Sequence, residues 1–254
     1  MKKLIIFPDI HGRKFWKEPF ETHKNDEDYG FIFLGDYLDA YGFEKISNVE
    51  AIDNFKDILE STLDHPRVIR LVGNHDIHYL PPLDKQYGCR RYDFNKQEIQ
   101  KLFLDNLDKF QVCHVEKIKD TRYVFSHAGF LKKWIAQAAY GINLEITLDN
   151  ANDLLLTENG LWALSMYGFE RGARSITAVG SCVWADINEH LDLYNKRFED
   201  DVYQIFAHNQ AFPDYEDLSQ YYIDENFAML DAQKPFILDL ETGELKEYYE
   251  QKTS

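Results

Sequence analysis

Cysteine is scarce in this 254-residue sequence, and long apolar runs are absent from it. The three cysteines, Cys89, Cys113 and Cys182, are an odd number in unrelated contexts, which favours free thiols in a reducing compartment. No run approaches the ~18 apolar residues that a membrane span requires, and the apolar stretch Leu4–Phe7 is too short for an export signal. We therefore expect a cytoplasmic protein with no membrane partner.

Basic residues are also few: 28 Lys and Arg stand against 44 Asp and Glu, which gives a formal net charge of −16. Such a charge argues against a nucleic-acid partner, because basic patches supply most of that affinity. A hydrophobic fraction of 44% with 15% aromatic residues is nevertheless enough for a substantial core, so the composition excludes a disordered chain. The sequence leaves the oligomeric state open.

No repeat, low-complexity stretch or Pro- and Gly-rich linker divides the sequence, so we expect a single domain over residues 1–254. Within it, residues from about 130 to 200 are a candidate helical insertion or cap. Short apolar runs alternate with helix-like segments in the first half, which predicts a largely parallel inner sheet. The expected strands are Leu4–Phe7, Phe31–Leu34, Val68–Val72, Gln111–Lys117, Arg122–Ser126, Val202–Phe206, Phe236–Leu240 and Leu245–Tyr249. The expected helices are Arg13–His23, Val49–Leu63, Lys96–Leu107, Leu131–Tyr140 and Thr147–Leu156. The acidic and aromatic segment Phe212–Asn226 is either a solvated edge or part of a substrate groove.

Polar side chains follow five of these strands. They stand in the segments Pro8-Asp9-Ile10-His11-Gly12, Gly35-Asp36-Tyr37-Leu38-Asp39, Gly73-Asn74-His75-Asp76, Ser126-His127-Ala128-Gly129 and Ala207-His208-Asn209. Ligands of open α/β sheets bind outside the carboxyl ends of the strands, so these side chains are expected in one crevice.

The residue types in these segments indicate a metal centre. Carboxylate, imidazole and amide groups without cysteine suit Mn, Fe or Zn and exclude a thiolate-rich structural zinc site. The six candidate ligands are Asp9, His11, Asp36, Asn74, His127 and His208. They are too many for one ion with an open position, but they suit two ions that share a carboxylate. Two ions ~3.5–4 Å apart can clamp a phosphoryl group and activate a bridging water.

Each segment alone has a structural explanation, because Asp-x-His, Gly-Asp and single histidines are common. Gly73-Asn74-His75-Asp76 is more specific. At ~5% usage per residue type, a given four-residue string is expected about once in 10⁵ positions. Its place as the third of five ordered segments argues against coincidence.

Together the five segments resemble the signature of the calcineurin-like metallophosphoesterases, in the branch of the phosphoprotein phosphatases and diadenosine tetraphosphatases. The resemblance implies a four-layer α-β-β-α sandwich with two central mixed β-sheets flanked by helices. It also implies that Asp9, His11 and Asp36 hold one metal, and that Asp36, Asn74, His127 and His208 hold the other. His75 would be the general acid, oriented by Asp39, and Asp76 would either tune His75 or hold the loop.

Two positions depart from that pattern. Gln210 stands where many members have a further histidine, and Ala40 stands where the branch has a phosphate-binding arginine. Another cation must then contact the phosphate, or the metals do most of that work. The candidates are Arg13, Arg90, Arg91, Arg171 and Arg174. Arg171 and Arg174 are favoured because they precede Val183-Trp184-Ala185-Asp186, which resembles the Trp-x-Asp stretch of the phosphoprotein phosphatases. Arg91 is a third candidate. The alternative for each of these arginines is a surface salt bridge.

The sequence thus predicts a dinuclear metal-dependent phosphoesterase. A metal-bridging hydroxide would attack phosphorus, and His75 would protonate the leaving group. The substrate could be a nucleotide, a small-molecule phosphate or a phosphoprotein, and the choice between mono- and diesters is open. The alternative is a non-catalytic metal-binding protein that uses the same fold to recognise a partner.

Overall fold

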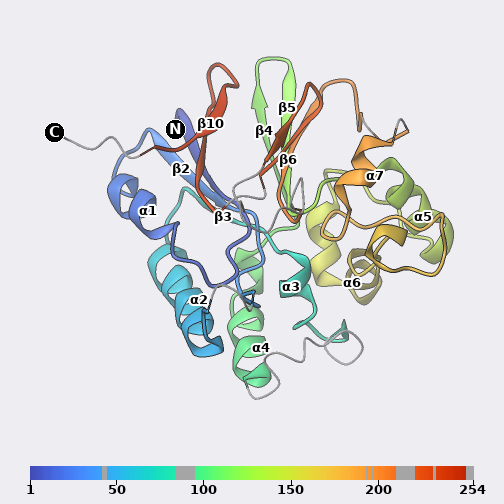
Figure 1. Ribbon diagram of the computed structural model, residues 1–254, viewed down its shortest axis with the longest axis horizontal. Coiled ribbons are helices and arrows are strands. Elements are labelled where there is room, and N and C mark those ends of the chain that lie inside the picture. Colours follow the sequence, from blue (N-terminus) through green and yellow to red (C-terminus); the bar gives the residue numbers. More distant parts are fainter. Residues whose placement is uncertain are drawn as a thin grey trace.

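Two five-stranded β-sheets form the centre of the computed structural model (Figure 1). The structure describes residues 1–41, 45–83, 95–192, 194–195, 197–209, 221–230 and 233–249. The first sheet has the order β10-β9-β1-β2-β3, with β1 Lys3–Phe7, β2 Tyr29–Phe33, β3 Val68–Arg70, β9 Phe236–Asp239 and β10 Leu245–Glu247. The second has the order β4-β5-β6-β8-β7, with β4 Cys113–Ile118, β5 Thr121–Ser126, β6 Val202–Phe206, β7 Tyr222–Ile223 and β8 Phe227–Met229.

Both sheets are mixed. In the first, β1, β2 and β3 are parallel, and β9 and β10 are antiparallel to their neighbours. In the second, β5, β6 and β8 are parallel, while β4 and β7 pair antiparallel at the edges. The polar segments of the sequence follow the carboxyl ends of five of these parallel strands: β1, β2 and β3 in the first sheet, and β5 and β6 in the second.

The two sheets pack face to face through alternate residues of their strands. Leu4 and Ile6 of β1 and Ile32 of β2 share one buried cluster with Phe125 of β5 and Ile205 of β6. The intervening residues of β1 and β2 belong to the cluster that packs against helices. Since successive side chains of a strand point to opposite faces, burial of both faces explains why these strands read as continuous apolar runs.

Helices cover the outer faces (Figure 1). On the first sheet lie α1 (Lys17–His23) and α2 (Asn48–Thr62), and α4 (Lys96–Leu104) packs beside α2 through Phe103 and Phe55. On the side of the second sheet lie α5 (Lys132–Ile142), α6 (Glu158–Leu164) and α7 (Ile187–Leu191). The result is the four-layer α-β-β-α sandwich that the resemblance implied. No helix in the described ranges is both long and apolar enough to cross a membrane.

Three segments differ from their predictions. The helix expected over 147–156 is reduced to a 3₁₀-helix at Ala151–Leu156. The reason is that the Asn150 side chain accepts from Thr147 N at 2.8 Å and donates to Glu145 O at 3.0 Å, which holds a turn there instead. The helix expected from residue 13 begins only at Lys17. Two short strands, β7 and β8, lie in a region where no strand was expected.

Candidate active site

Side chains from five strand ends meet at one place in the structure. Among the described residues, three groups each bring one potential ligand atom per residue within 4.8 Å of the others. One consists of Asp39, His75 and His78. The other two are Asp9, His11 and Asp36, and Asp36, His127 and His208, so Asp36, in the loop after β2, belongs to both of these. The site is therefore built around one shared carboxylate, with one group on the first sheet and the other extending to the second.

The backbone is strained at these loops. His11, Asp36, Asp39 and His208 have φ values of 42°, 53°, 60° and 73°, in the left-handed region that non-glycine residues rarely adopt. Each such residue costs about 1–3 kcal/mol and persists only where the surroundings enforce it. Four strained residues in a single cluster are typical of a functional site.

Close packing of two loops enforces part of this strain. Gly35 has φ +104°, and a Cβ atom added there would lie 2.4 Å from Gly73 N. A Cβ atom on Gly73 would lie 2.1 Å from Oδ1 of Asp36. Only glycines allow the loop after β3 to approach Asp36 so closely, which accounts for the glycine in both sequence segments.

Asp76 ties the same two loops together. Its carboxylate accepts from the backbone N–H groups of Asp36 at 2.7 Å, Tyr37 at 3.0 Å and Gly73 at 2.8 Å. Burial, reinforced by the Asp36 carboxylate, raises the pKa of Asp76 to about 7 despite these bonds. Of its two predicted roles, these contacts favour holding the loop.

Two histidines have a ring orientation fixed by backbone carbonyls. Nδ1 of His11 donates to Leu38 O at 2.8 Å, and Nδ1 of His127 donates to Leu34 O at 2.8 Å. A carbonyl can only accept, so each Nε2 carries the lone pair when the ring is neutral. These Nε2 atoms lie 3.4 Å and 3.3 Å from Oδ2 of Asp36. Such carbonyl-held imidazoles are typical of metal ligands.

Buried ring nitrogens without partners provide a test of whether a metal fits. Nε2 of His11 and Nε2 of His208 are buried and have no hydrogen-bond partner among the described residues. Asn74 completes this side of the site, with its Oδ1 3.0 Å from Nε2 of His127. Buried polar atoms are normally satisfied, and a divalent cation would satisfy these nitrogens and Asp36 at once. The residues present therefore fit a metal.

The cluster places carboxylates next to buried histidine rings, and this arrangement shifts the pKa values of both kinds of group. Asp36 has a pKa well below the usual range because the positive His127 and His75 outweigh its burial. For His127, burial is in turn outweighed by Asp36 and Asp9, so its pKa rises to about 9. Burial lowers the pKa of His11. The site favours positive charge beside Asp36.

His75 and Asp39 form a separate pair at the edge of the cluster. His75 Nδ1 donates to Asp39 Oδ2 at 2.7 Å, and the Tyr79 hydroxyl donates to Oδ1 at 3.0 Å. Although burial opposes it, hydrogen bonds from His75 and His78 hold the pKa of Asp39 below its usual range. The His75 side chain is 27% exposed, and its ring lies 5.2 Å from that of His11. An ionised Asp39 thus orients an accessible imidazole beside the metal-ligand candidates.

His78 also contacts Asp39, with Nε2 3.3 Å from Oδ2. His78 is not among the site residues that the sequence predicts. Its spacing was the available signal, since His75 and His78 are three residues apart around the short helix α3 (Asn74–Ile77) and therefore share a face.

The three arginines expected to bind phosphate have different positions. Arg171 is near the cluster. Its Nε lies 3.2 Å from Oδ2 of Asp186. Burial lowers the pKa of His208, and the positive charge of Arg171 lowers it further. Nε and Nη2 of Arg171 are buried without a hydrogen-bond acceptor in the described parts of the chain. Arg174 is exposed. Arg91 lies outside the described residues, as do Arg90 and Gln210.

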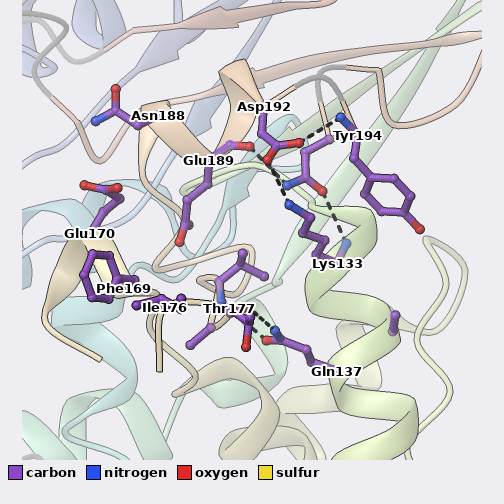
Figure 2. Close-up of a pocket in the computed structure, with 14 residues that line it drawn as sticks. Lys133, Gln137, Phe169, Glu170, Ile176, Thr177, Asn188, Glu189, Asp192 and Tyr194 are labelled. Carbon is purple, nitrogen blue, oxygen red and sulfur yellow. Dashed lines mark hydrogen bonds and ion pairs between the residues drawn. The ribbon is translucent and has the colours of Figure 1, made fainter. Parts of the chain in front are cut away.

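A separate pocket lies among the helices beside the second sheet (Figure 2). It has a volume of about 520 Å³. Its lining includes Lys133, Gln137, Phe169, Ile176, Glu189 and Asp192, and none of the predicted site residues. Lys133 is paired with Asp192 at 2.9 Å, so its charge is already neutralised. The pocket adjoins the segment that carries Arg171 but is not part of the metal-ligand cluster.

Comparisons with known proteins agree with this geometry. The chain matches a family described as calcineurin-like phosphoesterase over residues 2–222. Among solved structures, a cold-active protein tyrosine phosphatase has TM-score 0.53 at 17% identity and covers 97% of this chain and 78% of its own. A protein provisionally assigned as a diadenosine tetraphosphatase has TM-score 0.51 at 13% identity, with 97% and 93% covered. No curated protein matches the chain significantly.

Proposed function

Because the chain belongs to the calcineurin-like phosphoesterase family, and is thus a phosphate-ester hydrolase, we propose that its five strand ends hold two divalent metal ions. Asp9, His11 and Asp36 would hold the first, and Asp36, Asn74, His127 and His208 the second. The observation that carries this assignment is that Nε2 of His11 and Nε2 of His208, one in each group that shares Asp36, are buried without a hydrogen-bond partner among the described residues.

The chemical types of the candidate ligands also limit which metals the site can bind. Imidazole, carboxylate and amide ligands without thiolate suit Mn, Fe or Zn. When bound, the ions supply positive charge for the transferring phosphoryl group and lower the pKa of coordinated water. The family membership supports hydrolysis over the alternative of a protein that only binds a partner.

His75 would donate a proton to the leaving oxygen of the ester. The ring is accessible, and Asp39 holds its Nδ1 proton, which leaves Nε2 as the nitrogen that exchanges a proton with the substrate. The carboxylate of Asp39 also favours the protonated ring that a general acid requires. Asp39 is in turn fixed by Tyr79 and His78, so the pair is pre-organised.

Arg171 would bind a phosphate oxygen. Its charge acts on His208, and its Nη2 is buried without a hydrogen-bond acceptor in the described structure, whereas its Nε faces the Asp186 carboxylate. A phosphate oxygen in the site would provide an acceptor and would form a charge-assisted hydrogen bond. The substrate remains one of three classes: a nucleotide, a small-molecule phosphate or a phosphoprotein.

The metal assignment is tested by Asp36→Asn. This change removes the shared carboxylate charge, so the protein purified without chelator should lose most of its bound metal and its hydrolysis of an aryl phosphate. Elemental analysis of the purified protein measures the first effect. Asp57→Asn is the matched control, because Asp57 is exposed and pairs only with Lys17 in the described structure. Unchanged metal content in Asp36→Asn would refute the assignment.

A further inference from the structure

Arg13, in the loop after β1, lies beside the first group of metal-ligand candidates. Its Nη1 donates to the backbone oxygen of Asp9 at 2.8 Å. Its charge also contributes to the lowered pKa of His11, behind the larger effect of burial. The guanidinium is therefore next to two of the three residues in the Asp9–His11–Asp36 group.

Tyr41 links this guanidinium to the cluster. The Arg13 guanidinium carbon lies 5.8 Å from the centroid of the Tyr41 ring, within the range of a cation–π contact. The Tyr41 ring in turn packs on the His11 ring, with centroids 4.7 Å apart. The loop after β2 thus contributes an aromatic ring at Tyr41 and no cation at Ala40.

The two arginines near the site are associated with different groups of ligand candidates. Arg13 bonds to Asp9 and, through Tyr41, adjoins His11, both in the group on the first sheet. The charge of Arg171 acts on His208, in the group that extends to the second sheet. A chain with a net charge of −16 repels anions, so a local cation beside each group would help a phosphate to enter. A guanidinium has five donors in a planar fork, so it can hold a backbone carbonyl and a phosphate oxygen together.

We propose that Arg13, positioned by Tyr41, binds a non-reacting oxygen of the substrate phosphate beside the Asp9–His11–Asp36 group. This role rests on the proposed phosphoesterase function and specifies which residue of this chain recognises the phosphate. The competing explanation is structural: the bond to Asp9 alone would make Arg13 a support for the first metal-ligand loop.

Inorganic phosphate distinguishes the two explanations, because it requires no chemistry. Titration calorimetry of the manganese-loaded protein gives the phosphate affinity, and p-nitrophenyl phosphate gives KM and kcat. Loss of a charge-assisted hydrogen bond should weaken phosphate binding roughly tenfold to hundredfold in Arg13→Ala. KM should rise by a similar factor, with metal content as in the wild type. Arg13→Lys should recover part of the loss.

Arg197→Ala is the matched control, since Arg197 is an exposed arginine that bonds to Asp200 and lies outside the site. It should bind phosphate like the wild type. Unchanged phosphate affinity in Arg13→Ala, or a loss that only accompanies loss of metal, would overturn the role of Arg13. Failure of the wild type itself to hydrolyse any ester would instead overturn the proposed function.

Discussion

His75 makes separate contacts through its backbone and through its side chain. Its backbone N–H donates to Oδ1 of Asp36 at 2.9 Å, whereas its ring donates to Asp39. A substitution of the ring therefore leaves the contact with the shared carboxylate in place. This separation allows catalysis to be tested without disturbing the metal ligands.

We expect His75→Asn to retain its metal and to lose activity selectively. General acid catalysis contributes about 10²–10⁴-fold where the leaving group needs a proton. An alkoxide needs one, and a nitrophenolate does not, so kcat/KM should fall by that factor on an alkyl phosphate and far less on a nitrophenyl phosphate. Asp39→Asn should show the same bias more weakly. Equal losses on both esters together with reduced metal content would assign the pair a structural role.

Helix α7 rests on the second sheet through a buried histidine. The His190 ring stacks on Phe206, with centroids 4.4 Å apart, and its Nε2 donates to Ala128 O at 2.8 Å. Burial lowers the pKa of His190 to about 4. The folded protein thus keeps this ring neutral under conditions in which an unfolded chain would protonate it.

The stability of this contact should therefore depend on pH. Because the folded pKa lies below the ordinary value of about 6.5, the unfolded state binds the proton first, and the free energy of unfolding falls as the pH drops from about 6.5 to 4. The loss attributable to His190 is on the order of 3 kcal/mol at pH 4. Urea unfolding of the wild type and His190→Gln at pH 7 and pH 4 measures it. The variant should lose less stability over this interval, and parallel losses would contradict the prediction.

The strands and the irregular segments also show how much of the fold the sequence could predict. Strands β1 and β2 are buried on both faces, so each reads as an apolar run that ends in polar residues, and the candidate ligands follow directly. Irregular segments gave no such signal, because side-chain bonds such as those of Asn150 replace the periodic pattern. The contacts of Arg13 with Asp9 and Tyr41 depend on packing between loops, so only the structure could show them.

At the scale of the whole molecule, metal binding should contribute to stability. The candidate ligands come from both sheets, so ions held by them would bind the folded protein and not the unfolded chain. Ligand at 100 times its Kd stabilises a fold by about 2.7 kcal/mol. Chelation with EDTA should lower the Tm of the wild type by several degrees in a scanning fluorimetry measurement. Asp36→Asn should show little change, and an equal shift in both proteins would indicate that the chelator acts elsewhere.

The distance along the chain between the parts of the site has a consequence for biosynthesis. The backbone N–H of His208 donates to Oδ1 of Asp9, 199 positions earlier, at 3.2 Å. Contacts of such separation form late in folding, because the intervening chain must first be ordered. A nascent chain that has not yet delivered β6 carries Asp9, His11 and Asp36 but lacks His208. Under the proposed function, hydrolytic activity is therefore expected only once synthesis has passed the last candidate ligand and the two sheets have docked.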